Sequence, residues 1–290
     1  MSKSTKLEFI PWWLKLGAKL LLSRIPVSYT IWSKIGLFRH GYMGDFSYVI
    51  NNYETHRRLA LPHLPPNPVV LEMGPGDSVG TALVARAYGA AGCYLMDVGR
   101  FADDDLTKYA RLADELAKRG LPLGAWAPSG SLDELTASLG ARYMTRGLSD
   151  YAAIPAGSVH HIFSTSVLEH VFKDEFEATV KAWKRVLAPG GVVTHWVDLK
   201  DHLGYSLNNL RFSERVWESR LFRNSGFYTN RLRQSEILDI VARNGFTITA
   251  RRDVHWEHKV LPREKMHPAF RGFSDEEMAV RGFEFVAVSG

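Results

Sequence analysis

Two glycines follow an apolar run near residue 70, and an acidic residue ends the next apolar run. The run 69–73 is apolar apart from Glu72, and Gly74 and Gly76 follow it closely. This pattern predicts a buried parallel strand that ends in a tight turn, where bare backbone can approach a ligand. Asp97 lies 21 residues beyond Gly76, near the spacing of about 20 at which a carboxylate accepts ribose hydroxyls. These residues therefore predict a nucleotide-type pocket.

The turn differs from the one that binds dinucleotides. A Gly-x-Gly-x-x-Gly turn would place its third glycine where this chain has Val79. Glu72, just before the turn, would repel a diphosphate but would attract a cationic ligand. The residues thus favour a cationic nucleoside ligand over NAD.

Three segments in order resemble class I S-adenosylmethionine-dependent methyltransferases. They are Leu71-Glu72-Met73-Gly74-Pro75-Gly76 with Asp97, then Ile162-Phe163-Ser164-Thr165-Ser166-Val167-Leu168-Glu169-His170-Val171, then Leu187-Ala188-Pro189-Gly190-Gly191. The order and spacing are more specific than any one segment, and the resemblance covers residues 65–200 most firmly. It implies an α/β fold, a doubly wound and mainly parallel seven-stranded sheet, with S-adenosylmethionine as cofactor.

The resemblance also implies which residues hold that cofactor. Gly74 and Gly76 would let the loop pass close to it, Glu72 would lie near its amino-acid end, and Asp97 would hold the ribose hydroxyls. The implied cofactor site comprises Glu72, Gly74, Gly76, Ser78, Asp97, Val98, Leu148, Ser164 and Thr165. Two places depart from the family pattern, because Ser78 replaces the last glycine of the loop and His160 replaces an acid that often opens the fourth strand. These departures bear on the subfamily more than on the activity.

Alternating strand and helix patterns run from residue 69 to about 198. We expect strands near 69–73, 93–97, 141–145, 159–164 and 191–197, and helices near 79–89, 103–119, 130–139 and 174–187. Two further strands, 246–254 and 282–288, would pair antiparallel at the sheet edge, as in the resembled family. The expected organisation is a helical N-terminal cap, 1–64, and a methyltransferase core, 65–290, with substrate-side insertions at 199–235 and 255–280.

Polar residues follow the fifth predicted strand, at the edge where ligands bind in open α/β sheets. Methyl transfer to a protonated oxygen or nitrogen needs a base within about 3 Å of the acceptor. Histidine suits that role near neutral pH. We therefore expect catalysis from His195 and His202, with Asp198 orienting an imidazole or holding an acceptor hydroxyl. The alternative makes His195 a core histidine and Asp201 a helix N-cap.

The first insertion mixes aromatic rings with amide and guanidinium donors, which suits sugars, carboxylates or phosphates. The expected substrate contacts are Asp201, Asn208, Arg211, Tyr228, Asn230 and Arg231. An exposed helical insertion with solvated arginines is the preferred interpretation of Arg215, Arg220 and Arg223. The second insertion would form a flap or an interface.

The N-terminal region differs in character from the core. Residues 12–22 show a helical pattern with a tryptophan pair and two lysines one turn apart. Such a helix could lie in a membrane interface or, as we prefer, pack as a cap on the core or a second subunit. Aromatic residues between 32 and 48 could roof the pocket or simply form the core of the cap.

Composition narrows the class of protein without deciding it. The chain has 290 residues, 46% of them hydrophobic, and a single cysteine, Cys93, so we expect neither disulfides nor a multi-cysteine metal site. No His/Asp/Glu ligand cluster calls for a metal, and a cytoplasmic location is the default. The net charge of +5 fits nucleic acid, an anionic membrane surface or a merely basic protein, but no RNA-binding module accompanies it.

The leading interpretation is a methyltransferase that moves a methyl group from S-adenosylmethionine to an oxygen or nitrogen of a small polar acceptor. A sugar, a glycan intermediate or a secondary metabolite would fit a weaker resemblance to enzymes of glycoconjugate and small-metabolite pathways. An RNA methyltransferase and a non-catalytic cofactor-binding module are the alternatives. Nucleic acid is disfavoured as a partner, peripheral contact with the inner face of the membrane through the N-terminal helix is considered, and the subunit number and the acceptor atom stay open.

Overall fold

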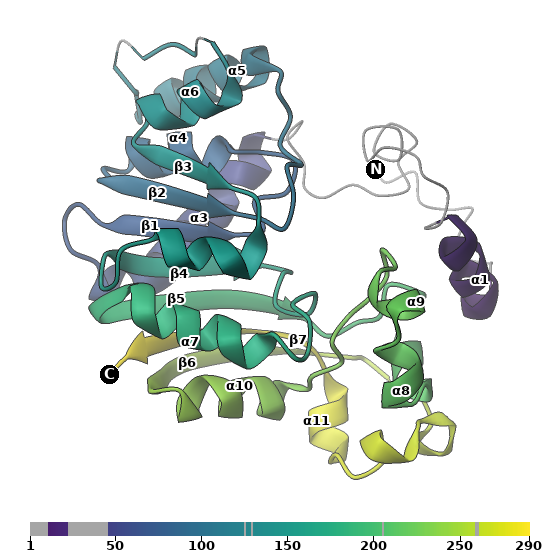
Figure 1. The fold of residues 1–290 in the computed structure, drawn as a ribbon. Helices are drawn as coiled ribbons and strands as arrows, with labels where there is room; N and C mark the ends of the chain where they lie inside the picture. The colour runs from purple at the N-terminus through teal and green to yellow at the C-terminus, as the bar shows by residue number, and fades with distance from the viewer. Residues whose placement is uncertain (1–10, 23–45, 125, 129, 205, 259–260) are drawn as a thin grey trace.

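The computed structural model describes residues 11–22 and 46–290, apart from 125, 129, 205 and 259–260. A seven-stranded sheet forms its centre, in the order β3-β2-β1-β4-β5-β7-β6 (Figure 1). The first five strands pair in parallel, and β7 runs antiparallel to both β5 and β6. The strands are β1 (Val69–Met73), β2 (Gly92–Met96), β3 (Ala141–Met144), β4 (Val159–Thr165), β5 (Leu187–Asp198), β6 (Phe246–His255) and β7 (Val280–Ser289). The predicted fold class, a mainly parallel doubly wound sheet with an antiparallel pair at one edge, is confirmed.

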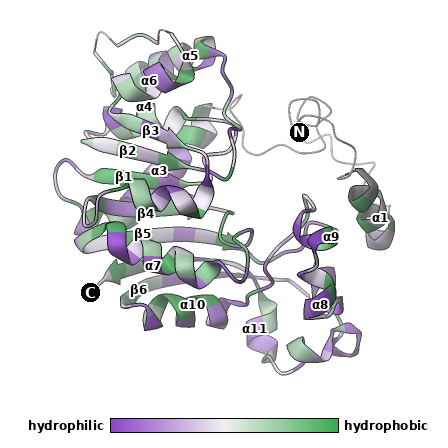
Figure 2. Ribbon diagram, viewed as in Figure 1, coloured by the Kyte–Doolittle hydropathy of each residue, from purple (hydrophilic) through white to green (hydrophobic). Residues whose placement is uncertain are grey.

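Helices cover both faces of this sheet. The α-helices of the described residues are α1 (Trp12–Leu22), α3 (Phe46–Ala60), α4 (Gly80–Ala87), α5 (Leu106–Lys118), α6 (Leu132–Ser138), α7 (Phe176–Val186), α8 (Glu214–Trp217), α9 (Arg220–Arg223), α10 (Gln234–Arg243) and α11 (Asp275–Ala279). Side chains of α3, α4 and α5 share one apolar cluster with the sheet, and those of α7 and α10 share another. Figure 2 shows apolar residues alternating with polar ones along α10, as a one-sided contact with the sheet requires.

The predicted elements differ from the observed ones mainly at their starts. Helix α5 begins at Leu106 rather than near 103, because Asp105 caps it by accepting a hydrogen bond from the Thr107 amide. Strand β5 begins four residues before the predicted 191, since Leu187 already pairs with Val159 of β4 before a register shift. The periodicity located the elements, whereas capping and pairing set their ends.

The first insertion and the N-terminal helix together form what we call the side lobe, residues 12–22 and 203–228. Trp12, Leu16 and Leu20 of α1 pack against an apolar cluster in this insertion. The buried members of that cluster are Leu203, Trp217, Phe222, Phe227 and Tyr228. In Figure 1, α8 and α9 lie beside the sheet rather than on either of its faces. Among the described residues, no helix combines the length and the apolar character that crossing a bilayer would require.

A directed chain of hydrogen bonds joins α3 to the centre of the sheet. The Thr165 hydroxyl donates to Asn52 Oδ1 at 2.6 Å, so its oxygen accepts from His56 Nε2 at 2.9 Å. His56 Nδ1 then accepts from the Thr194 hydroxyl at 2.8 Å, whose oxygen accepts from His161 Nε2 at 2.8 Å. Burial lowers the pKa of His56 to about 4 and that of His161 well below its usual value, so both rings are neutral.

Replacement of Thr194 by valine tests this chain. Thr194→Val removes the one hydroxyl that serves both rings and leaves two buried ring nitrogens without partners. We expect a loss of about 2–4 kcal/mol in the free energy of unfolding, measured by urea denaturation. Thr136→Val is the matched control, because this equally buried hydroxyl makes a single bond to the Asp133 carbonyl. Equal losses in the two variants would contradict the bridging role.

Candidate active site

A cavity of about 600 Å³ opens at the carboxyl ends of β1, β2 and β4. Its wall combines glycine turns, three acidic residues, several aromatic rings and one histidine. The lining includes Tyr48, Asn52, Glu72, Gly74, Gly76, Asp97, Val98, Phe101, Gly147, Leu148, Thr165, His170 and Phe172. Seven of the nine predicted cofactor residues lie on this wall: Glu72, Gly74, Gly76, Asp97, Val98, Leu148 and Thr165.

The turn after β1 depends on its two glycines. Gly74 and Gly76 adopt φ values of 69° and 66°, a region that other residues seldom occupy. A Cβ added at Gly74 would also lie 2.4 Å from Cγ2 of Val167. The Gly76 amide donates to Asp97 Oδ2 at 3.1 Å, and the Val98 amide donates to Asp97 Oδ1 at 2.7 Å. This carboxylate therefore fixes the turns after β1 and β2 against each other.

Burial disfavours the ionised forms of Glu72 and Asp97. Desolvation raises the pKa of Glu72 to about 7. The negative charge of Asp97 raises it further, whereas a hydrogen bond with the Thr81 side chain opposes the shift. Oε2 of Glu72 has no hydrogen-bond partner in the structure. Burial likewise raises the pKa of Asp97 to about 6, although the amides of Val98 and Gly76 oppose the shift. A ligand with a cationic end and ribose hydroxyls, as S-adenosylmethionine has, fits this pair.

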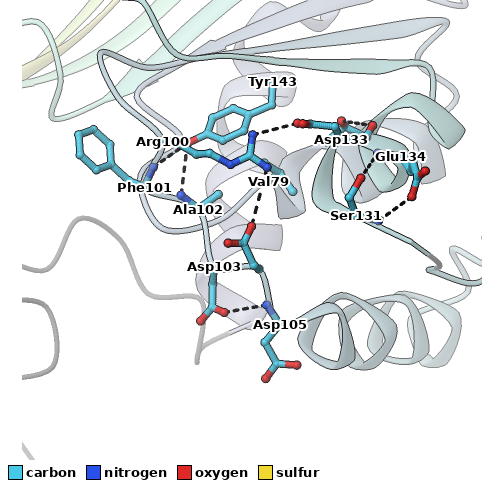
Figure 3. A network of polar contacts seen from close by, with 12 residues as sticks. Val79, Arg100, Phe101, Ala102, Asp103, Asp105, Ser131, Asp133, Glu134 and Tyr143 are labelled. Carbon is cyan, nitrogen blue, oxygen red and sulfur yellow. Dashed lines mark hydrogen bonds and ion pairs between the residues drawn. The ribbon is translucent and has the colours of Figure 1, made fainter. Parts of the chain in front are cut away.

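The loop after β2 forms a second wall and is held by Tyr143. The Tyr143 hydroxyl accepts hydrogen bonds from the amides of Phe101 and Ala102, at 2.9 and 3.2 Å. Arg100 reaches across to Asp133 at 3.0 Å, as Figure 3 shows. Phe101 and the exposed side chain of Val98 are thereby presented to the cavity.

Two predicted cofactor residues do not line the cavity. Ser78 accepts a hydrogen bond from the Gly80 amide at the start of α4. Ser164 is completely buried and shares a hydrogen bond of 2.7 Å with His195 Nδ1. Both residues shape the backbone behind the wall, and we correct their expected contact with a ligand to this supporting position.

The predicted base His195 also lies away from the cavity. Its ring stacks on Trp183 of α7 with 4.7 Å between ring centroids, and it has no exposed surface. Burial holds its pKa well below the usual value. Asp198 pairs with Lys200 at 3.0 Å and does not line the cavity either. His195 cannot reach a substrate there, so the expectation that it is the base is corrected, whereas a catalytic role of Asp198 stays a prediction.

Another histidine occupies the position that His195 was expected to fill. His170, in the turn after β4, lines the cavity. Its Nδ1 lies 2.8 Å from the Tyr228 carbonyl oxygen, and its Nε2 lies 3.1 Å from Nε2 of His202. The two imidazoles stack with 4.9 Å between centroids. The structure thus brings the predicted His202 to the site through His170, whose role the sequence alone did not reveal.

The predicted substrate residues of the first insertion stabilise the backbone. The Asp201 carboxylate accepts from the amides of residues 203, 204, 206 and 208, which closes a loop. Asn208 accepts from Arg211 Nε at 2.9 Å, and the Arg211 guanidinium lies over the Trp12 ring. Arg231 is buried, donates to the carbonyls of Asn209 and Phe212, and pairs with Glu214.

The remaining two substrate predictions support the turn that carries His170. Asn230 Nδ2 donates to the carbonyls of Leu168 and Val171, at 2.7 and 2.9 Å. Tyr228 is buried and donates through its hydroxyl to Glu218 at 2.8 Å. Neither side chain lines the cavity, so the expectation of direct substrate contact is corrected for the whole set of Asp201, Asn208, Arg211, Tyr228, Asn230 and Arg231.

Helix α3 contributes lining residues that the motifs did not indicate. Asn52 and Tyr48 lie on the cavity wall, and Tyr48 belongs to the aromatic-rich segment for which a roof over the pocket and a cap core were both considered. Trp32, Leu37, Phe38, Tyr42 and Met43 of that segment lie outside the described residues. Within the described ranges, no three His, Cys, Asp or Glu side chains come together as a metal site would require.

Residues 131–194 match a methyltransferase domain. The enzyme class predicted from the sequence, a methyltransferase that uses S-adenosylmethionine, agrees with this match. The matched segment spans β3, β4 and most of β5, and it includes the turn that carries His170. No curated protein matches the chain.

Solved structures of methyltransferases resemble the chain at low identity. An S-adenosylmethionine-dependent methyltransferase from Mesorhizobium loti is 14% identical, with 80% of this chain and 96% of that chain covered and a TM-score of 0.44. Phosphoethanolamine N-methyltransferase 2 from Haemonchus contortus is also 14% identical, with coverages of 91% and 60% and a TM-score of 0.46. Likenesses of this kind assign no acceptor to the chain.

The raised pKa of Glu72 predicts how binding depends on pH. A cation in the cavity favours ionised Glu72, so lowering the pH through about 7 weakens the affinity for S-adenosylmethionine, by up to about tenfold per pH unit. Calorimetric titration of Glu72→Gln should show binding weakened at pH 8 by about tenfold or more and no pH dependence centred near 7. The exposed Glu257→Gln is the control.

Glu72→Gln should weaken cofactor binding but should stabilise the ligand-free fold. Folding raises the pKa of Glu72 above its unfolded value, so the ionised group destabilises the ligand-free fold at pH 8. Glu72→Gln should therefore raise the free energy of unfolding at pH 8 by about 1–3 kcal/mol, and less at pH 5. A lower stability at pH 8 would contradict the proposed desolvation of the carboxylate.

Proposed function

We propose that the protein transfers a methyl group from S-adenosylmethionine to an oxygen or nitrogen of a small polar acceptor, and that His170 takes the acceptor proton. One observation carries the proposal: a single cavity holds Glu72 and Asp97 at the turns after β1 and β2, and His170 at the turn after β4. The cofactor supplies an electrophilic methyl group when bound. The chain supplies the binding groups, the base and the enclosure.

The groups that would bind the cofactor are already oriented by hydrogen bonds or by burial. The Asp97 carboxylate is aimed by the amides of Gly76 and Val98 and can accept hydroxyl donors. The buried Glu72 carboxylate favours the cationic amino-acid end. Leu148 and Phe101 provide apolar surface for a purine.

The groups that contact His170 determine which of its ring nitrogens can act as the base. A carbonyl oxygen can only accept, so His170 Nδ1 carries the hydrogen in its contact with the Tyr228 carbonyl. The neutral ring therefore has its lone pair on Nε2, which can take a proton from an acceptor hydroxyl or amine. His202 Nε2 lies 3.1 Å away and, because His170 Nε2 carries no hydrogen in the neutral ring, His202 is the donor in this contact. This hydrogen bond must open before His170 Nε2 takes the acceptor proton, which His170 then holds while the acceptor receives its methyl group.

A sugar hydroxyl, a glycan intermediate or a polar secondary metabolite suits this arrangement. The acceptor end of the cavity joins the imidazole of His170 to the aromatic face of Phe172, and a polar group beside an aromatic face matches the two sides of a sugar ring. A positioned base suits a hydroxyl better than an already nucleophilic thioether or amine. Proton removal is thus the chemistry that the acceptor end supports.

Calorimetry of cofactor binding is the first test of this function. We expect S-adenosylmethionine and S-adenosylhomocysteine to bind and NAD not to bind. Asp97→Ala should weaken both affinities by about 10- to 100-fold, because it removes charge-assisted hydrogen bonds to the ribose. Selective binding of NAD would overturn the proposal and indicate an oxidoreductase.

Turnover tests the base. With methyl-labelled S-adenosylmethionine and a panel of hydroxylated sugars, glycan intermediates and amines, His170→Gln should lower kcat by about 10²- to 10⁴-fold while leaving cofactor affinity unchanged. His63→Gln, an exposed histidine outside the cavity, is the control. Full activity of His170→Gln on an acceptor that the unaltered protein methylates would remove His170 from the mechanism.

A further inference from the structure

Exposed apolar side chains gather on the side lobe. The large apolar side chains that are strongly exposed in the described chain number seven, and four of them belong to α1, α8 and α9. Trp13 and Leu14 are 56% and 48% exposed, and Val216 and Leu221 are 42% and 39% exposed. Isolated exposed apolar residues are ordinary, but their concentration on one part of a surface marks a contact site.

These four side chains belong to helices that pack on one apolar cluster. Trp12 contacts Phe212 edge to face, with 6.2 Å between ring centroids. Phe212 in turn lies 5.4 Å from both Trp217 and Phe222, again between centroids. Trp13 adjoins Trp12 in the chain, and Val216 and Leu221 adjoin the other two buried rings. The exposed groups therefore extend from helices that are held together through their buried faces.

Most of the net charge of the protein lies in the same lobe. Residues 12–22 and 208–224 contain six basic and two acidic residues, whereas the whole chain has a net charge of +5. Both acidic side chains are engaged inside the lobe or next to it, since Glu214 pairs with Lys173 and Arg231 and Glu218 accepts from Tyr228.

Arg215 and Arg220 carry the excess positive charge outward. Both are exposed, and within the described part of the chain neither takes part in an ion pair. Arg223, by contrast, is engaged with Asp174 at 2.7 Å. The three helices of the lobe thus carry guanidinium groups without ion pairs as well as exposed tryptophan and aliphatic side chains.

We propose that the side lobe docks on the surface of an anionic lipid bilayer. Tryptophan and short aliphatic side chains beside basic residues match the interfacial region of a membrane, where apolar groups enter and arginines meet phosphate. Nucleic acid offers no apolar layer for Trp13, Leu14 and Leu221. A second copy joined face to face would bring the two basic surfaces together.

Docking through the side lobe would bring one end of the cavity close to the membrane. Phe172 lines the cavity and packs on the cluster of the side lobe, and His170 is held by Tyr228 of the same lobe. Resting on the proposed function, this places the acceptor end of the cavity beside the membrane, which suits an acceptor carried on a lipid. Docking itself requires neither cofactor nor acceptor and can be tested separately.

Sedimentation with vesicles tests the docking. The full chain is mixed with vesicles of phosphatidylcholine alone or of phosphatidylcholine with 30% phosphatidylglycerol, with the lipid concentration varied. We expect at least about tenfold tighter binding to the anionic vesicles, a preference that weakens as salt is added. Equal binding to the two compositions, or binding to neither, overturns the proposal.

Paired variants locate the contact. Arg215→Glu with Arg220→Glu, and separately Trp13→Ser with Leu14→Ser, should each weaken anionic-vesicle binding by about tenfold or more. Arg58→Glu with Arg142→Glu changes the net charge equally at exposed positions outside the lobe and should bind within about threefold of the unaltered protein.

The variants also separate docking from folding and from chemistry. Unchanged calorimetric affinity for S-adenosylmethionine shows that a variant is folded, and loss of vesicle binding with that affinity intact supports the proposal. Unaltered vesicle binding in both lobe variants overturns it. So does a dimer in light scattering that Trp13→Ser with Leu14→Ser dissolves, because the surface would then be covered by a second copy.

Discussion

The carboxylate and backbone of Asp97 join the ends of three neighbouring strands. Its side chain accepts hydrogen bonds from the amides after β1 and β2, its amide donates to the Met144 carbonyl at the end of β3, and its carbonyl accepts from the Gly147 amide at 2.8 Å. The glycine turns that line the cavity are thus fixed through one residue. A partly desolvated acid holds this position, which makes the same group both a structural tie and a binding group.

The two sides of the cavity depend on different parts of the chain. Turns of the sheet form the side that we propose binds the cofactor, whereas the first insertion supports the side that carries His170. Asn230 holds the carbonyls on either side of His170, and the Tyr228 backbone fixes the tautomer of its ring. A change in the insertion can therefore move His170 without disturbing the turns after β1 and β2.

The sequence predicted the sheet, and it also indicated the glycine turns and the acid that line the cavity, because both depend on local signals. Apolar runs mark buried strands, and Gly74, Gly76 and Asp97 occur where the carboxyl ends of strands must place them. The catalytic prediction was wrong for His195 because neighbouring residues of a strand face opposite sides of the sheet, and only the register shows that residue 195 faces α7. His170 gave no comparable signal, since its position depends on a carbonyl 58 residues away.

The polar residues of the insertion were predicted to contact substrate, but in the structure they bond to the backbone. Asp201, Asn230 and Arg231 have the residue types of a binding site, yet their hydrogen-bonding groups satisfy backbone amides and carbonyls of irregular loops. Buried irregular backbone needs such partners as much as a ligand does. Composition cannot separate the two uses, because the same donors and acceptors serve both.

The hydrogen-bond chain from His161 to Asn52 couples the core of the sheet to the cavity wall. In the structure each member donates toward the cavity, and the Asn52 oxygen accepts from the Thr165 hydroxyl. If the Asn52 amide were turned over, every hydrogen bond of the chain would have to reverse, because its nitrogen would donate to Thr165, which would then donate to His56. The atom that Asn52 presents to a ligand is therefore coupled to the tautomers of two neutral histidines, neither of which lines the cavity.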